Sequence, residues 1–379
     1  MLKSVVHISD YSSLYSGNFV KSLQVLSYNL KKSGFQTVLV FPYEAKSRKW
    51  AKELIHSGHK VYFLSQNTST FKLIKEIKNI IVKENSVIVH SHFTNYDILT
   101  SLSASVASVK LRRKIKVIWH VHSDFPIKYN NTRILKDFLK FRIIGNCNSM
   151  ITVSEELRKQ QEKRGGRKEL INYIPNGIDF SRIQRKHDNL KLRSFYGISQ
   201  KDLVLLSFGW DPITKGIDTI LDALEAIEQV KEKPPVKMIV IGEDTLNEFI
   251  KNRYNTNPPE WLIILPPNEN VSEYYQIANI FISASRWEGF SYSVAEAMYS
   301  GLLIIANQIK GLNWIEEAPF SLFYSNSSSK HLKNLILDSS LNSNEKIDSI
   351  SKSNKKFIEE NYTMEIWSEK IISYYKSII

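Results

Sequence analysis

The chain has 379 residues, 42% of them apolar and 23% charged, a composition that excludes a disordered or collagen-like protein. This length exceeds what one hydrophobic core usually organises, so two domains are expected. The net charge of +13 is uneven, because residues 1–180 hold 29 basic and 13 acidic side chains and the remainder holds 22 and 25. The basic half is expected to attract an anionic partner: a nucleic acid, an anionic membrane surface or a phosphorylated ligand.

Cysteine content and hydropathy predict the compartment. With one cysteine, Cys147, the chain can form neither an intrachain disulfide nor a zinc cluster, which fits a reducing cytoplasm. The apolar run at the N-terminus is too short for a signal peptide, and no stretch of about 18 apolar residues occurs. We therefore expect a cytoplasmic protein whose contact with a membrane, if any, is peripheral.

Short runs rich in β-branched residues alternate with helix-compatible stretches, a pattern typical of parallel α/β architecture. In the N-terminal half the predicted strands are residues 4–9, 37–42, 60–65, 86–92, 116–122 and 149–154. The predicted helices are residues 18–33, 47–57, 70–84, 95–108, 131–146 and 155–164. Strands that are apolar almost throughout need helices on both faces of their sheet.

A second series follows the polar stretch 181–200. Its predicted strands are residues 203–209, 236–242, 262–267, 280–285, 302–306 and 321–324, and its last helices are 331–338, 345–360 and 364–379. We therefore predict two α/β domains, residues 1–180 and 181–362, followed by a final segment, residues 363–379. Ligands of open parallel sheets bind beyond the carboxyl ends of the strands, so residues that follow strands are the functional candidates.

The segment FISASRWEGFSYSVAEAMYSGLLII (281–305) holds the most informative of these residues. A strand is predicted to end at Ser285 and a helix to begin near Ser293. Glu288 in the loop and Glu296 in the helix can then face a ligand near the helix N-terminus, where backbone N–H groups favour phosphate. Carboxylates also accept hydrogen bonds from sugar hydroxyls. The structural alternative is a capping box formed by Ser293 and Glu296, with Glu288 as a solvated loop charge.

The same segment resembles the E-x7-E motif of the retaining glycosyltransferases of family 4, also known as group 1. Three further stretches resemble this family in the same order: residues 87–92 with WHVHSD (119–124), residues 151–178 and residues 206–223. The resemblance covers almost the whole chain. It implies the GT-B fold, in which two Rossmann-like domains face a central cleft and a C-terminal helix crosses back to the N-terminal domain.

This resemblance implies that the C-terminal domain binds a nucleotide-sugar donor. Glu296 would bind the nucleotide ribose, Lys215 and the helix N-terminus near Ser293 the diphosphate, and Glu288 with the backbone after Gly289 the sugar. The other residues predicted to bind the donor are Gly17, Arg286, Phe290 and Ser291. The family has an arginine five positions before the lysine; here that position is Trp210, and Arg286 is the candidate to supply the missing charge.

The N-terminal domain contributes histidines. His120 and His122 alternate along a predicted strand, so both point to one face, and the resemblance implies that His122 orients or stabilises the reacting sugar. His90 and His92 repeat this alternation one strand earlier and, like His120, are predicted at most to line the cleft; for His120 and His122 the alternative is a satisfied core residue. Asn176 is predicted to lie at a hinge beside the cleft. Gly17 is either part of a phosphate-approaching loop or a plain turn glycine.

We therefore predict a retaining glycosyltransferase that transfers a sugar to a hydroxyl of a glycan or lipid-linked acceptor, in cell-surface polysaccharide or glycolipid synthesis. No metal-ligand cluster is visible, so no metal or other cofactor is expected. The basic domain would hold the acceptor and contact an anionic membrane, and no nucleic-acid-binding module is recognisable. Two alternatives stay open: a nucleotide-sugar 2-epimerase, and a catalytically silent GT-B partner subunit, which Trp210 favours.

Overall fold

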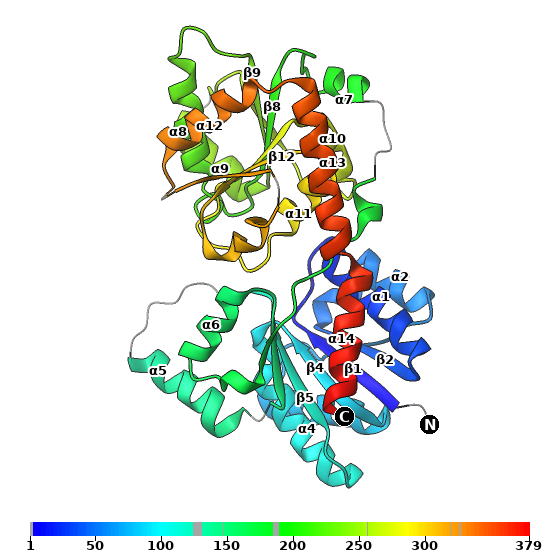
Figure 1. Cartoon of the computed structure of the whole chain (residues 1–379). Helices are drawn as coiled ribbons and strands as arrows, with labels where there is room; N and C mark the ends of the chain where they lie inside the picture. The colour runs from blue at the N-terminus through cyan, green and yellow to red at the C-terminus, as the bar shows by residue number, and fades with distance from the viewer. Residues whose placement is uncertain are drawn as a thin grey trace. The chain divides into compact units, whose positions relative to one another are not determined.

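The computed structural model describes residues 3–123, 131–145, 147–184, 189–255, 257–318, 320–325 and 327–379. The chain forms two compact units (Figure 1). The first unit is Met1–Gly177 together with Met364–Ile379, and the second is Ile178–Thr363. The predicted domains divide the chain at residues 180 and 362 instead.

The first unit is built on a parallel sheet of seven strands in the order β3-β2-β1-β4-β5-β6-β7. The strands are β1 (Lys3–Ser9), β2 (Phe35–Phe41), β3 (Lys60–Phe63), β4 (Ser86–His92), β5 (Lys116–Val121), β6 (Ser149–Thr152) and β7 (Ile171–Tyr173). The sequence predicted six of them and missed β7, which has only three residues at the sheet edge. The strand order changes direction between β1 and β4, and such switch points are where ligands bind in open parallel sheets.

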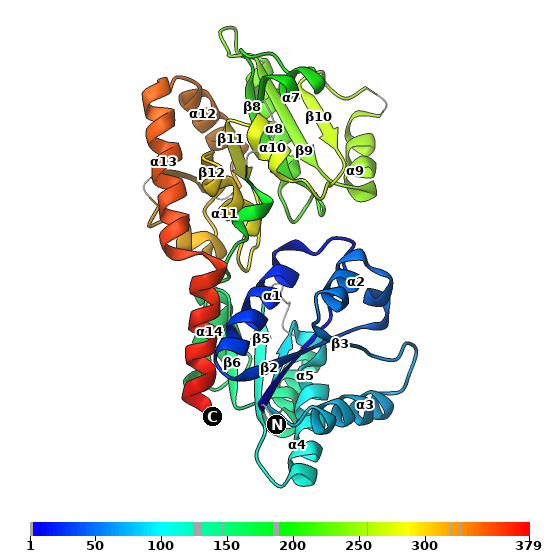
Figure 2. The same cartoon turned by 90° about the vertical axis from the view of Figure 1, so that its right-hand side faces the viewer.

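Helices cover both faces of this sheet (Figure 2). They are α1 (Gly17–Lys32), α2 (Lys49–His56), α3 (Thr70–Lys83), α4 (Asp97–Leu111), α5 (Asn131–Phe138), α6 (Glu155–Lys163) and α14 (Met364–Ile378). Helices α1 and α14 lie against each other and pack on Val5, Ile88 and Ile118 of the sheet. Helix α4 lies on the opposite face, where Ser101 accepts a hydrogen bond from Trp119 Nε1.

The predicted helix over residues 131–146 has two parts. Helix α5 ends at Phe138, and the chain continues as a π-helical segment, Leu139–Ile144. Asn146, the last predicted residue, lies outside the described residues. Across the described parts of the chain, every helix is too short or too polar to cross a membrane.

The second unit contains a parallel sheet of six strands in the order β10-β9-β8-β11-β12-β13. The strands are β8 (Leu203–Phe208), β9 (Val236–Ile241), β10 (Leu262–Leu265), β11 (Ile280–Ser283), β12 (Leu303–Asn307) and β13 (Ser321–Tyr324). Its helices are α7 (Asn189–Phe195), α8 (Ile217–Glu228), α9 (Asp244–Tyr254), α10 (Ser272–Ile277), α11 (Tyr292–Tyr299), α12 (Ser329–Ser340) and α13 (Asn344–Asn361). The switch point lies between β8 and β11. Lys215, Glu288 and Glu296 follow these two strands in the chain.

Candidate functional site

Lys215 and Glu288 form a largely buried ion pair in the second unit. Lys215 Nζ lies 2.5 Å from Glu288 Oε1, and the two side chains are 12% and 10% exposed. Ser285 Oγ donates to the same carboxylate oxygen at 2.8 Å. The ammonium also lies 5.1 Å from the ring centroid of Trp210, which occupies the position of the family's arginine. The structure therefore brings together the residues predicted to hold the donor diphosphate and the donor sugar.

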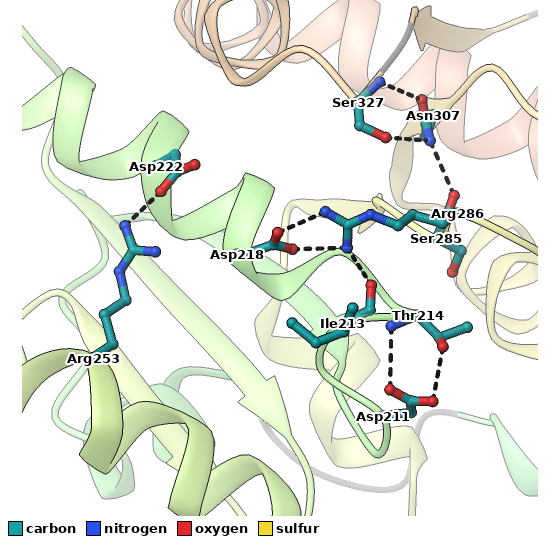
Figure 3. Close-up of polar contacts among 10 residues, drawn as sticks. All are labelled: Asp211, Ile213, Thr214, Asp218, Asp222, Arg253, Ser285, Arg286, Asn307 and Ser327. Atoms are coloured by element: carbon teal, nitrogen blue, oxygen red, sulfur yellow. Dashed lines mark hydrogen bonds and ion pairs between the residues drawn. The ribbon is translucent and has the colours of Figure 1, made fainter.

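Gly216 allows the start of α8 to approach the end of β11. Its φ is 66°, and a Cβ atom there would lie 2.1 Å from the carbonyl oxygen of Ala284. The backbone N–H of Arg286 donates to Thr214 O at 2.8 Å, and the Asp211 carboxylate accepts from the N–H and the hydroxyl of Thr214 (Figure 3). These contacts fix the loop that carries Lys215 against the loop that carries Glu288.

Arg286 is engaged by Asp218 in the first turn of α8. Its guanidinium donates two hydrogen bonds to the Asp218 carboxylate, at 2.9 and 2.6 Å, and one to the Ile213 carbonyl (Figure 3). These hydrogen bonds to Asp218 raise the pKa of Arg286. These bonds hold the guanidinium against Asp218 and Ile213, and the role of Arg286 as the substitute for the missing arginine stays a prediction.

Two residues that the sequence analysis missed support the Glu288 loop. Asn307, buried at the end of β12, donates to Ser285 O at 3.1 Å and also bonds Ser327 (Figure 3). Gly311 packs so closely that a Cβ atom would lie 2.0 Å from Glu288 O. The position of Asn307 directly after the predicted strand 302–306 was the one signal that could have identified it.

Glu296 lies buried on α11 between Arg182 and Tyr275. Arg182 Nη1 donates to one carboxylate oxygen at 2.9 Å, and Tyr275 OH donates to the other at 2.8 Å. Burial raises the pKa of Tyr275 well above its usual value, so the phenol stays a neutral donor. These two bonds orient the carboxylate. Neither partner was predicted from the sequence.

The capping-box interpretation of Ser293 and Glu296 is wrong. Helix α11 begins at Tyr292 with Ser291 as its N-cap, and the Ser291 side chain makes no cap hydrogen bond. Ser293 therefore lies inside the first turn, with its Oγ 3.2 Å from Ser291 Oγ. Gly289 is buried, and the ring of Phe290 stacks on Trp314 with centroids 4.8 Å apart, which places that side chain in the core.

Five histidines of the first unit gather at the carboxyl ends of β1, β4 and β5. They are His7, His90, His92, His120 and His122. In the sheet register His7 lies opposite His90, and His92 lies opposite His120, so the rings share the face that α1 and α14 cover. The strand pattern placed His120 and His122 on one face, but His7 was not among the predicted residues.

Three of these rings form a hydrogen-bonded chain. His7 Nδ1 lies 2.9 Å from His92 Nε2, and His92 Nδ1 lies 3.1 Å from His122 Nε2. Burial lowers the pKa of all five imidazoles, to about 3 for His7 and His122, so the rings are neutral at pH 7. A chain in which each ring donates through Nδ1 leaves His122 with a Nδ1–H group for a further acceptor.

His120 differs from its neighbours. It is fully buried, and both of its ring nitrogens lack a hydrogen-bond partner among the described residues. Burying a polar group without a hydrogen-bond partner lowers stability by about 1–3 kcal/mol. An apolar side chain at this position would not carry that cost. The interpretation of His120 as a satisfied core residue is therefore wrong.

The loops after β1 and β4 meet at this histidine cluster. Gly17 begins α1 with a φ of 55°, and a Cβ atom there would lie 3.0 Å from Tyr11 OH. Two residues later, Phe19 packs edge-on to His92 with ring centroids 5.2 Å apart. Phe93 directly after β4 has a φ of 64°, a conformation that costs a bulky residue about 1–3 kcal/mol and that is enriched at functional sites. The geometry thus makes the carboxyl end of this sheet a second candidate functional region.

Two further predictions concern Asn176 and the WHVHSD motif. Asn176 is buried directly before the boundary between the units, at Gly177. Asp124, the last residue of the WHVHSD motif, lies outside the described residues.

Solved structures resemble the chain over its full length. A glycosyltransferase from Rickettsia africae has a TM-score of 0.81 at 17% identity and covers 100% of this chain and 98% of its own. Anabaena Alr3699/HepE, solved in complex with UDP and glucose, has a TM-score of 0.79 at 16% identity and covers 99% of this chain and 100% of its own. With the two Rossmann-like sheets, these similarities confirm the predicted GT-B fold.

Sequence comparisons point the same way. The N-acetyl-alpha-D-glucosaminyl L-malate synthase of Bacillus anthracis is 22% identical over 63% of this chain, a match that spans 61% of that protein. The UDP-Gal:alpha-D-GlcNAc-diphosphoundecaprenol alpha-1,3-galactosyltransferase of Escherichia coli is 24% identical over 70% of both chains. The family model "Glycosyltransferase Family 4" matches residues 20–182, and "Glycosyl transferases group 1" matches residues 188–364. The chain therefore belongs to the group 1, or family 4, glycosyltransferases.

Proposed function

We propose that this protein is a retaining hexosyltransferase that moves a sugar from a nucleotide-sugar donor to a hydroxyl of a glycan or lipid-linked acceptor. The observation that carries the proposal is the largely buried Lys215–Glu288 pair beside the switch point of the second sheet. It offers one cation to an anionic leaving group and one carboxylate to sugar hydroxyls. The UDP in the similar Anabaena structure and the UDP-galactose named for the Escherichia coli relative support a uridine nucleotide as the first donor to test.

Four of the predicted residues have a role in this proposed reaction. Lys215 and the N-terminus of α11 stabilise the charge that develops on the departing diphosphate. Glu288 binds hydroxyls of the transferred sugar, and Glu296, held by Arg182 and Tyr275, presents an oriented carboxylate to the ribose. His122 donates its Nδ1–H to a hydroxyl of the reacting sugar.

The transfer exchanges one glycosidic bond for another. The bond from the sugar's anomeric carbon to the diphosphate breaks, a bond to the acceptor oxygen forms on the same face, and the acceptor's proton leaves with the nucleoside diphosphate. Lys215 supplies the positive charge on the phosphates, and we propose that no metal ion is needed there.

Purified protein is expected to release nucleoside diphosphate from a UDP-hexose only when lipid-extract or glycan acceptors are present. The rate should be the same with and without added Mg²⁺, and NMR of the product should show the donor's anomeric configuration. Conversion of the donor to its 2-epimer without acceptor would instead support an epimerase. If the protein neither turns over nor binds any donor in a panel of nucleotide sugars, the silent-subunit alternative is supported.

We further propose that the protein binds the cytoplasmic face of the cell membrane through a helical surface of the first unit, which we name the α5 surface. Its exposed apolar residues are Ile134, Leu135, Phe138 and Ile143, each more than half exposed. Lys136 and Arg142 are exposed on the same segment. Amphipathic segments of this kind bind anionic bilayers by inserting apolar side chains beside cations. The lipid-linked acceptor named for the Escherichia coli relative supports such a location.

Removing apolar side chains from the α5 surface is expected to weaken membrane binding. The double variant Ile134→Ser/Phe138→Ser should bind vesicles containing phosphatidylglycerol at least about tenfold more weakly, because each inserted side chain contributes roughly 1.5–3 kcal/mol when fully buried. The matched control is Leu190→Ser/Phe195→Ser, which alters two exposed apolar residues of the second unit. Vesicle sedimentation measures both. Equal binding to neutral and anionic vesicles, or unchanged binding by the first variant, would contradict the proposal.

A further inference from the structure

One ring nitrogen each of His92, His120 and His122 approaches a common point in the first unit. The three nitrogens all lie within 4.8 Å of one another. His92 and His120 are fully buried, and His122 is partly exposed. We propose that these three imidazoles bind a divalent late transition-metal ion, with Zn²⁺ as the occupant.

The spacing of the nitrogens fits such an ion. Zn–N bonds of about 2.0–2.1 Å place two ligands of a tetrahedral site about 3.3 Å apart. His92 Nδ1 and His122 Nε2 are already 3.1 Å apart, so the ion would take the place of the proton that they share. His120 stacks on His122 with ring centroids 4.0 Å apart, and a nitrogen of its ring lies within 4.8 Å of the other two, so this ring must move closer to supply the third ligand.

The chemistry of the three side chains supports the same ion. Neutral imidazole is a good ligand for Zn²⁺ and its neighbours in the transition series, whereas Mg²⁺ and Ca²⁺ prefer oxygen. Ligation would also satisfy one of the two His120 nitrogens that lack a partner within the described structure. The cluster therefore supplies three suitable ligands, and binding an ion would lower the free-energy cost of burying His120.

A second triad, His7, His90 and His92, is a weaker candidate. The Nδ1 atom of His90 is hydrogen-bonded to Tyr375 OH at 2.5 Å, which leaves its Nε2, without a partner among the described residues, as the available ligand. The exposed fraction of each of these residues is 1% or less, so none of the three reaches the surface to bind an incoming ion. In the proposed site, the exposed part of His122 provides that entry.

Metal binding would have a consequence for His122, which rests on the proposed function. An ion on Nε2 leaves the ring proton on Nδ1, because metal ligation of one nitrogen sets the tautomer. His122 would then be held as a donor toward a sugar hydroxyl. The ion would also join β4 to the segment after β5 and stabilise the first unit.

The test uses the full chain after chelator treatment and dialysis, titrated with Zn²⁺ in competition with a chromophoric chelator and, separately, with Co²⁺. We expect one ion per chain, visible d–d absorption of tetrahedral Co²⁺, and a higher unfolding temperature with Zn²⁺. His120→Gln and His122→Gln should each weaken Zn²⁺ binding by more than the roughly 10–100-fold that loss of an outer partner costs. These measurements need no turnover, so they remain decisive if the proposed transferase activity is not found.

Three control variants complete the test. His56→Gln and His331→Gln change exposed histidines and should leave Zn²⁺ binding unchanged. His7→Gln changes a member of the second triad that is hydrogen-bonded to His92, so it should weaken Zn²⁺ binding by no more than the roughly 10–100-fold cost of losing an outer partner. If His120→Gln does not fold, His122→Gln decides, because that side chain is partly exposed. The absence of saturable binding, or equal binding by His122→Gln and the parent protein, would overturn the proposal. Loss of binding in His7→Gln with retention in His122→Gln would overturn the choice of triad.

Discussion

Replacing Lys215 with methionine or Glu288 with glutamine is expected to lower the rate of sugar transfer by roughly 10²–10³, the usual cost of removing one charge-stabilising group from an active site. The loss of transfer rate on replacing Lys215 should lie at the upper end of that range. Trp210 occupies the position of the family's second cation, and Arg286 is already bound to Asp218. The measurement is the initial rate of nucleoside diphosphate release, with Lys251→Met and Glu317→Gln as exposed controls of matched chemistry.

Stability separates a catalytic role from a structural one. Each single variant leaves one charge buried without its partner, which costs about 3–5 kcal/mol for a fully buried pair and less here, because the side chains are 10–12% exposed. The double variant Lys215→Met/Glu288→Gln removes both charges, so its unfolding temperature should recover toward that of the parent. Its transfer rate should not recover. A double variant that regains activity together with stability would show that the pair only supports the fold.

Gly216→Ala is expected to lower both stability and activity far more than Gly197→Ala. The two glycines belong to the same unit and have nearly the same φ, 66° and 67°. A left-handed conformation costs an alanine about 1–2 kcal/mol at either position. At Gly216 the added Cβ would also meet Ala284 O at 2.1 Å, whereas at Gly197 nothing lies within 4 Å. Relief of that overlap should add about 1–3 kcal/mol.

The overlap acts on the site because Lys215 directly precedes Gly216. A displacement of about 1 Å in a positioned group can cost 10²-fold in rate. We therefore expect Gly216→Ala to lose about two orders of magnitude in transfer rate and Gly197→Ala to retain the parent rate. Thermal unfolding and the rate assay measure the pair of variants. Equal unfolding temperatures would show that the second unit absorbs the extra methyl group without strain.

The sheets could be predicted because their strands are buried on both faces. Strand β4 is buried throughout and was predicted with its observed bounds, since an apolar run is sufficient for a buried parallel strand. Strand β13 was also predicted with its observed bounds, although three of its four residues are only partly buried at the sheet edge. Strand β7 was missed because Ile171–Tyr173 has too few residues to show a pattern. Helix α5 was extended too far, because helical periodicity does not distinguish α-helix from the π-helical turn that follows Phe138.

The candidate donor-binding residues were predicted from the family resemblance, whereas their contacting residues in the structure were not predicted. Arg182 and Glu296 are 114 positions apart, and no local pattern joins them. Gly311 is required because the backbone of Glu288 approaches it, which is a property of the packed loop rather than of the sequence around the glycine. The Asp218 carboxylate that engages Arg286 likewise comes from a different segment of the chain.

The histidine cluster shows what each level of information determined. The sequence by itself placed His90 with His92, and His120 with His122, on one face of their strands, because side chains alternate along a strand with a period of two. Only the tertiary structure put β4 between β1 and β5 and set the register that aligns His7 with His90 and His92 with His120. Strand order and register depend on how distant helices pack over the whole sheet. The fold class and the two histidine pairs could thus be predicted from local sequence patterns. The cluster of five histidines could not, because it depends on strand order and register.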